Sequence, residues 1–192
     1  MKKYELTSET KVINGVKLHR IKALESFGRV EKGELGGWIE SEKNLSQDGD
    51  AWVFDNATVR GNAKVSGTST VYGNATVSGN AKVRGNATIS GNAIVSGNAT
   101  ISGNATINGD ATISGNATVR GKEDFIVFKN WWSSGRYFTW TRSNNKWKVG
   151  CFYGSGEELI TKAYKDSAKS GREYERVVKY VESIMEEENN NK

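Results

Sequence analysis

The middle third of this chain repeats a six-residue phrase, and that repeat constrains the fold more than any other feature. From Ala51 to Gly121 the pattern Gly-Asn-Ala-x-Val/Ile-x recurs through twelve hexads without an insertion. A helix would place apolar residues three and four positions apart, and hairpins would need a turn about every eight to twelve residues. A period of six with one aliphatic residue, one small residue and one Gly-Asn pair instead predicts a β-solenoid.

Each part of the hexad has an expected place in such a coil. The Val or Ile lies in mid-strand and points inward, and the Gly-Asn pair forms the corner because both residues tolerate left-handed backbone angles. Three sides of six residues close one triangular coil, so twelve hexads predict four coils of a left-handed parallel β-helix. One coil cannot bury its own apolar side, so stacked coils make the core and both ends need covers.

The flanking segments supply these covers and give a three-part organisation. We expect an N-terminal β cap over residues 1–50, the β-helix over residues 51–122, and a small C-terminal α+β domain over residues 123–192. In the cap, residues 10–18 have the pattern of a hairpin whose type I′ turn is Asn14-Gly15. The fold class is therefore mostly β.

The last domain combines strands with two helices. Residues 125–128 have the composition of a strand, and residues 137–153 that of a hairpin turning at Asn144-Asn145. Two capping boxes, Ser155 to Glu158 and Ser170 to Glu173, each open a segment with apolar residues at helical spacing.

Outward residues of the coils can be sorted by side, because positions eighteen residues apart share a side. The second side carries aromatic residues in its first coils, and the third carries Ile94 as its outward aliphatic residue. Ile94 marks either an interface in a symmetric homo-oligomer, with a trimer favoured, or a solitary exposed side chain. The first side is a basic face, and its cations are candidate partner-binding residues: Lys64, Lys82, Arg84 and Arg120.

A second candidate site lies in the C-terminal hairpin. From Lys129 to Lys148 there are five cations and no acidic residue, interleaved with aromatic residues. Aromatic faces with cations suit stacking on bases and neutralising phosphates, whereas the alternative is that these aromatics form the core of a small domain. Neighbouring Trp131 and Trp132 cannot both face one core, so the stretch from Trp131 to Arg136 is the best candidate. The predicted binding residues are Trp131, Trp132, Arg136, Tyr137, Trp140 and Arg142.

Enzymatic chemistry has few candidate residues. Many solenoids of this type are acyltransferases that use a His as general base, but this chain has one His, His19, which lies outside the coils. Cys151 has no second Cys for a metal site, and Asp48, Asp50 and Asp55 have the spacing of turn residues. We therefore predict no metal and no cofactor, with a CoA-dependent acyltransferase as the alternative function.

The composition of the chain indicates where in the cell we expect the protein to be. The chain has no run of eighteen apolar residues and no positively flanked apolar leader, so we expect a cytoplasmic protein without a membrane partner. A net charge of +5 permits, without requiring, an anionic partner.

Several strings together resemble a known family. Leu18 to Leu24, Leu35 to Ser46 with its Gly-Gly-Trp, and the hexad repeat are similar to hexapeptide-repeat proteins encoded by phages and prophages, which are often labelled transferase-like. Phe128 to Phe138 and Trp147 to Phe152 are similar to a frequent partner segment of that family. The resemblance implies a phage accessory protein that binds a host protein, nucleotide or nucleic acid. Such a protein would inhibit a defence protein or sequester its nucleotide signal.

Overall fold

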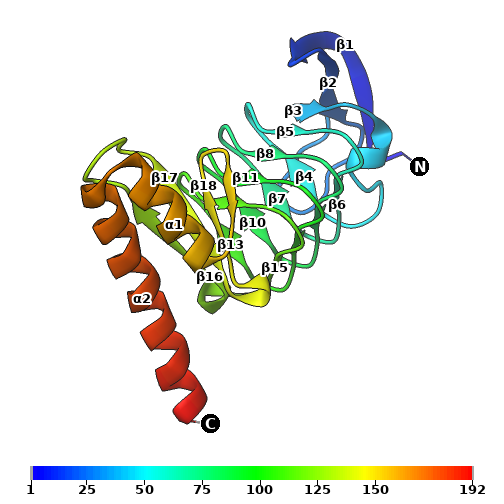
Figure 1. Cartoon of the computed structure of the whole chain (residues 1–192). Coiled ribbons are helices and arrows are strands. Elements are labelled where there is room, and N and C mark those ends of the chain that lie inside the picture. The colour runs from blue at the N-terminus through cyan, green and yellow to red at the C-terminus, as the bar shows by residue number, and fades with distance from the viewer. Residues whose placement is uncertain (1, 192) are drawn as a thin grey trace. The chain divides into compact units, whose positions relative to one another are not determined.

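The computed structural model describes residues 2–191 and divides into two compact units (Figure 1). The solenoid unit comprises the chain up to Phe125 together with Thr141–Asn144. The C-terminal unit comprises Ile126–Trp140 and the chain from Asn145 onward. No helix in the described range combines the length and the apolar character that crossing a membrane requires.

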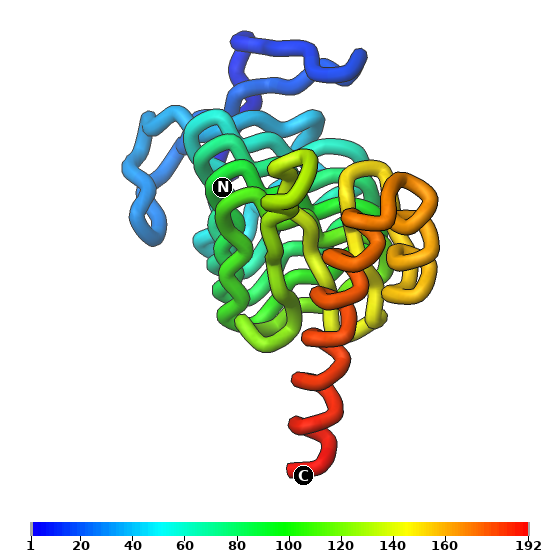
Figure 2. The backbone as a smooth tube through the Cα atoms, turned by 60° about the vertical axis from the view of Figure 1, so that its left-hand side comes forward, coloured from blue at the N-terminus to red at the C-terminus, as the bar shows by residue number. Residues whose placement is uncertain are grey.

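The hexads fold as predicted into short strands that stack in three parallel sheets. Figure 2 shows the successive coils as stacked loops of the backbone. The sheets have the orders β4-β7-β10-β13, β6-β9-β12-β15 and β5-β8-β11-β14, and residues eighteen apart are paired, as in Val71 with Ile89. The strands are β4 Trp52–Val53, β5 Thr58–Val59, β6 Lys64–Val65, β7 Thr70–Val71, β8 Thr76–Val77, β9 Lys82–Val83, β10 Thr88–Ile89, β11 Ile94–Val95, β12 Thr100–Ile101, β13 Thr106–Ile107, β14 Thr112–Ile113 and β15 Thr118–Val119.

The interior of the solenoid consists of the small and aliphatic positions of the hexad. Every Val or Ile at the mid-strand position and every Ala two places earlier is fully buried. Ser69 takes the place of that Ala in one hexad, and its hydroxyl donates a hydrogen bond of 2.7 Å to the carbonyl of Ser66. A buried hydroxyl with a partner costs little, so the core continues through this position.

Gly and Asn have different roles at the corners of the coils. The corner Gly residues between Gly61 and Gly115 all have a left-handed φ, from +63° to +75°. The Asn residues do not share this conformation; their side chains instead form ladders along the solenoid. Asn62 donates to Asn80 at 3.1 Å and Asn80 to Asn98 at 2.9 Å. Asn is therefore selected at the corners by contacts between coils rather than by backbone angle.

The N-terminal segment contains the predicted hairpin and one coil that the repeat pattern does not reveal. Strands β1 (Tyr4–Ile13) and β2 (Val16–Ala23) are antiparallel, and Asn14 and Gly15 both have positive φ, which confirms the type I′ turn. Strand β3 (Leu35–Ile39) pairs with β2 on one side and in parallel with β5 on the other. The parallel part of this sheet thus has five strands, β3-β5-β8-β11-β14, so the solenoid has about five turns rather than four.

The additional coil explains the Gly-Gly-Trp lead-in. A Cβ at Gly36 would lie 2.6 Å from the carbonyl oxygen of Val53, and one at Gly37 would lie 2.8 Å from that of Ala57. Only glycine permits β3 to approach the next coil this closely. A 3₁₀ helix (η1, Glu42–Asn44) follows, and Leu45 then bridges Val65 in parallel to complete the turn.

The C-terminal unit is a four-stranded sheet with two helices. The sheet has the order β16-β17-β18-β19, and its aromatic side chains pack with apolar residues of the helices. Two 3₁₀ helices, η2 (Lys122–Asp124) and η3 (Arg142–Asn144), belong largely to the solenoid unit. The bounds are β16 Phe125–Lys129, β17 Tyr137–Thr141, β18 Lys146–Val149, β19 Phe152–Gly154, α1 Gly156–Asp166 and α2 Ala168–Asn190.

Two local expectations for this unit are wrong and one is confirmed. The second strand of the hairpin predicted over residues 137–153 is broken by Gly150, whose φ of +55° turns the chain between β18 and β19. The Ser155 capping box is confirmed, because Glu158 N–H donates to Ser155 Oγ at 3.2 Å. Helix α2 is capped by Ser167 rather than by Ser170, because Ser167 Oγ accepts from the Ser170 N–H at 3.0 Å.

Candidate functional site

The predicted basic face is present on the sheet β6-β9-β12-β15. Lys64 pairs with Lys82 in neighbouring coils, and both side chains are exposed, as are those of Arg84 and Arg120. The face is basic only in part, because Thr100 and Thr118 occupy the Lys column in the last two coils. These cations belong to the solenoid unit, whereas most of the predicted aromatic site belongs to the C-terminal unit.

The loop between β16 and β17 separates the two neighbouring tryptophans as expected. Trp131 is 73% exposed, whereas Trp132 is 8% exposed and lies in the core of the C-terminal unit. The ring of Trp132 meets that of Tyr174 edge-on at 4.9 Å between centroids. Trp131 is therefore available to a partner, and Trp132 is a structural anchor of the loop.

Hydrogen bonds of the buried residue Asn130 fix the conformation of this loop. Its Oδ1 accepts hydrogen bonds from the backbone N–H and the hydroxyl of Ser133, both at 3.0 Å. Its Nδ2 donates to Tyr174 Oη at 2.9 Å, and its backbone N–H donates to the carbonyl of Arg136 at 2.8 Å. Burial raises the pKa of Tyr174, so its hydroxyl stays protonated at neutral pH. A buried amide with all these partners holds residues 130–136 in one conformation.

The remaining predicted residues divide between surface and interior. Tyr137 is partly exposed, with the Lys129 ammonium 5.7 Å from its ring centroid, and Arg136 is exposed beside it. Trp140 is buried, and its Nε1 donates to Asn145 Oδ1 at 2.8 Å. Arg142 belongs to the solenoid unit, where its Nε donates to the carbonyl of Glu123 at 2.8 Å.

The surface that remains is defined by Lys129, Trp131, Arg136 and Tyr137, and we call it the Trp131 surface.

A cleft of about 300 Å³ adjoins this surface within the C-terminal unit. Arg136 and Lys162 line it, together with the hydroxyls of Ser133 and Ser134 and the carboxylate of Asp166. Two cations with the Ser134 hydroxyl suit an anionic group of a partner, whereas the Ser133 hydroxyl already donates to Asn130. The single carboxylate offsets part of the positive charge.

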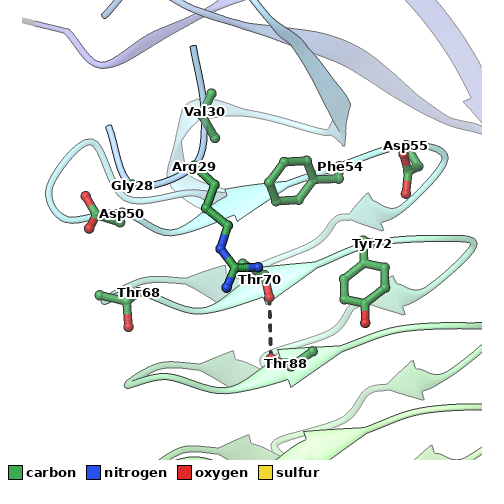
Figure 3. Close-up of a pocket in the computed structure, with 10 residues that line it drawn as sticks. All are labelled: Gly28, Arg29, Val30, Asp50, Phe54, Asp55, Thr68, Thr70, Tyr72 and Thr88. Carbon is green, nitrogen blue, oxygen red and sulfur yellow. Dashed lines mark hydrogen bonds between the residues drawn. The ribbon is translucent and has the colours of Figure 1, made fainter. Parts of the chain in front are cut away.

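A larger pocket, of about 580 Å³, lies in the solenoid unit and was not among the predicted sites. Figure 3 shows the Arg29 side chain directed toward Thr70, with the rings of Phe54 and Tyr72 beside it. The floor is the sheet β4-β7-β10-β13, and the wall is the turn around Gly28 and Arg29. The aromatic residues of this side of the solenoid were a signal for the pocket. Nothing in the sequence placed Arg29 over them.

His19 lies in β2 of the solenoid unit. It pairs with Thr10 of β1 and Ile39 of β3 in the sheet, and its Nδ1 is 3.4 Å from the carbonyl oxygen of Thr7. The imidazole is half-buried against this hairpin and does not line either of the pockets described above. Its contacts are those of a structural strand residue.

Comparison with known proteins supports the repeat architecture. The YdcK beta-solenoid repeat model matches residues 71–85 and 99–114. An uncharacterized acetyltransferase, YdcK of Escherichia coli (strain K12), is 33% identical over 67 residues, which cover 31% of this chain. The match spans about a fifth, 21%, of the length of that relative. The family model thus matches residues of the coils, which agrees with the β-solenoid that the hexapeptide repeat forms in the structure.

Proposed function

We propose that this chain is a non-enzymatic accessory binding protein, of the kind that phages and prophages encode, in which the β-solenoid is the scaffold and the Trp131 surface contacts a host partner. The observation that carries the proposal is the 73% exposure of Trp131 on a loop that Asn130 holds in one conformation. Tryptophan is among the residues that contribute most to binding at protein interfaces, so an exposed Trp on an ordered loop is suited to be the central contact of one.

The chemistry around Trp131 indicates what kind of partner fits. Lys129, Arg136 and the nearby Lys162 give the surface a positive potential, and Tyr137 adds a second partly exposed ring. A partner with an apolar or planar group for Trp131 and an acidic group or phosphate for Arg136 would match both features. An acidic protein segment and a nucleotide both have this combination. A host defence protein or its nucleotide signal would be targets of this chemistry.

Replacing Trp131 and Arg136 together by alanine is expected to reduce partner binding at least about thirtyfold, the usual effect of removing a central interface aromatic residue. The full tagged chain would be used to capture host proteins and small molecules from lysate, with identification by mass spectrometry and affinity measured on the purified partner. Tyr180, on α2 of the same unit and 58% exposed, gives the matched control. The proposal fails if the double variant retains the partner that Tyr180→Ala retains.

Acyl transfer is the second candidate, because the YdcK relative carries the name of an acetyltransferase. In that case acetyl-CoA should bind saturably, and His19→Ala should abolish transfer without unfolding the chain. The contacts of His19 favour the opposite result: no saturable binding at millimolar acetyl-CoA, and a variant that differs only in the packing of the β1–β2 hairpin. Calorimetry with acetyl-CoA and a thiol-release assay would distinguish these outcomes.

A further inference from the structure

The turn that carries Arg29 is built to hold that side chain over the solenoid. Phe27 and Val30 exchange backbone hydrogen bonds of 3.0 and 2.8 Å, which places Gly28 and Arg29 at the tip. Gly28 has a φ of +51°, and a Cβ there would lie 3.1 Å from the Cβ of Asp50. The turn is therefore closely fitted to the first coil.

Both flanks of the turn are anchored in the core. The ring of Phe27 meets that of Trp52 edge-on at 5.4 Å, and Val30 is buried. The Lys3 ammonium lies 4.7 Å from the centroid of the Phe27 ring and donates to the carbonyls of Gly49 and Ala51, both at 2.9 Å. Arg29 is thus presented by a fixed support rather than by a free loop.

The guanidinium of Arg29 has no carboxylate partner within residues 2–191. It points toward Thr70, whose hydroxyl is 3.5 Å from that of Thr88 in the next coil (Figure 3). A guanidinium without a counter-ion, held over hydroxyl groups, is suited to a bidentate contact with a planar oxyanion.

The other residues that line the pocket indicate which chemical groups the rest of the ligand should carry. Phe54 and Tyr72 supply apolar ring faces on one side, and the carboxylates of Asp50 and Asp55 lie in the pocket wall. One Asp55 oxygen accepts from the Gly73 N–H at 3.1 Å, which fixes that carboxylate as an acceptor. Carboxylates accept hydrogen bonds from hydroxyl groups, and threonine hydroxyls both donate and accept.

From these groups we propose that the pocket binds a sugar that bears one carboxylate, a uronic acid residue. Arg29 pairs with the ligand carboxylate, Thr70 binds a ring hydroxyl, and Tyr72 contacts the apolar face of the ring. Asp50 and Asp55 lie at opposite ends of the pocket (Figure 3), so they accept hydrogen bonds from hydroxyls of different sugar residues of a short glycan. A ligand with several negative charges is disfavoured because Asp50 and Asp55 would repel it. A neutral sugar would leave the Arg29 charge without a partner. The volume of about 580 Å³ falls within the usual range of ligand sites and exceeds one sugar ring, so a short acidic glycan fits.

The probe is sodium glucuronate, titrated into the ¹⁵N-labelled full chain while amide shifts are followed by NMR. We expect saturable shifts at Arg29, Thr70 and Tyr72, with a dissociation constant of about 1 mM or lower for a ligand of this size. Arg29→Gln should weaken binding roughly tenfold or more, because it removes a charged hydrogen-bonding pair. Methyl glucoside, the neutral analogue, should bind more weakly than glucuronate to the unaltered chain.

The control variant is Arg84→Gln, which removes the same charge from another side of the same unit. It should leave glucuronate binding unchanged. Equal binding by Arg29→Gln and the unaltered chain would overturn the proposal, as would an absence of shifts at the pocket. Tighter binding of benzoate or adenosine monophosphate than of glucuronate would also overturn it, because the pocket would then select a planar aromatic anion rather than a sugar.

Discussion

Replacing Trp132 by alanine is expected to unfold the C-terminal unit at low denaturant, whereas the same change at Trp131 should leave its stability almost unchanged. Trp132 packs edge-on against Tyr174 at 4.9 Å and against Phe138 at 6.1 Å, and its indole Nε1 has no hydrogen-bond partner in the described chain. The Trp132→Ala change therefore removes packing contacts and no hydrogen bond. Removing a buried tryptophan costs about 3–5 kcal/mol, which is a large part of the stability of a small domain.

The two neighbouring variants can be compared by guanidinium unfolding followed by near-ultraviolet circular dichroism, with amide exchange of α2 as the local probe. Exchange of α2 amides should accelerate strongly in Trp132→Ala and remain unchanged in Trp131→Ala. Trp132→Phe should fall between them, because a smaller ring still fills part of the site. A free energy of unfolding within about 1 kcal/mol of the unaltered chain for Trp132→Ala would show that this side chain is not part of the core.

The second large effect is expected at a corner of the solenoid. Gly91 and Gly109 occupy one column, with φ of +67° and +63°. A Cβ at Gly91 would lie 2.9 Å from the backbone nitrogen of Gly109, whereas a Cβ at Gly109 meets nothing within 4 Å. An alanine in this conformation costs about 1–2 kcal/mol at either position. At Gly91 the clash with fixed backbone adds about 1–3 kcal/mol.

Gly109→Ala is thus the matched control for Gly91→Ala, because the two share the conformational strain and differ only in the neighbouring coil. Urea unfolding should give a lower midpoint for Gly91→Ala than for Gly109→Ala. Amide exchange should locate the difference at the coils on either side of Gly91. Equal midpoints would mean that the coils separate to accept a methyl group at little cost.

The repeat made most of the solenoid predictable, but not its first coil. Within the hexads, partners are eighteen residues apart, whereas Ile39 pairs with Val59 and Leu45 with Val65, each twenty residues apart. Ile39 and Leu45 are six residues apart, but Leu45 and Val53 are eight apart, so two additional residues interrupt the period between the first coil and the repeat. The Gly36-Gly37 pair was the remaining signal, and its meaning depends on how closely β3 approaches the next coil.

The candidate sites were less predictable, because they depend on contacts between distant segments. Alternation showed that one of Trp131 and Trp132 must leave the core, but only the packing against Tyr174 decides which. The pocket needs Arg29 from a turn before the coils and Tyr72 from a coil. Similarly, Ser167 rather than Ser170 begins α2, because α1 ends at Asp166 and the next helix follows at once.

The Asn ladders and stacked Gly corners also bear on how a gene for this protein can change. Each middle coil meets its neighbours through the same groups on both sides, as in the chain of hydrogen bonds from Asn62 through Asn80 and Asn98 to Asn116. Duplication or loss of eighteen codons would add or remove one coil, about 4.8 Å of height, without creating a new kind of contact. Recombination within the repeat can therefore adjust the length of the solenoid while both ends keep their sequences.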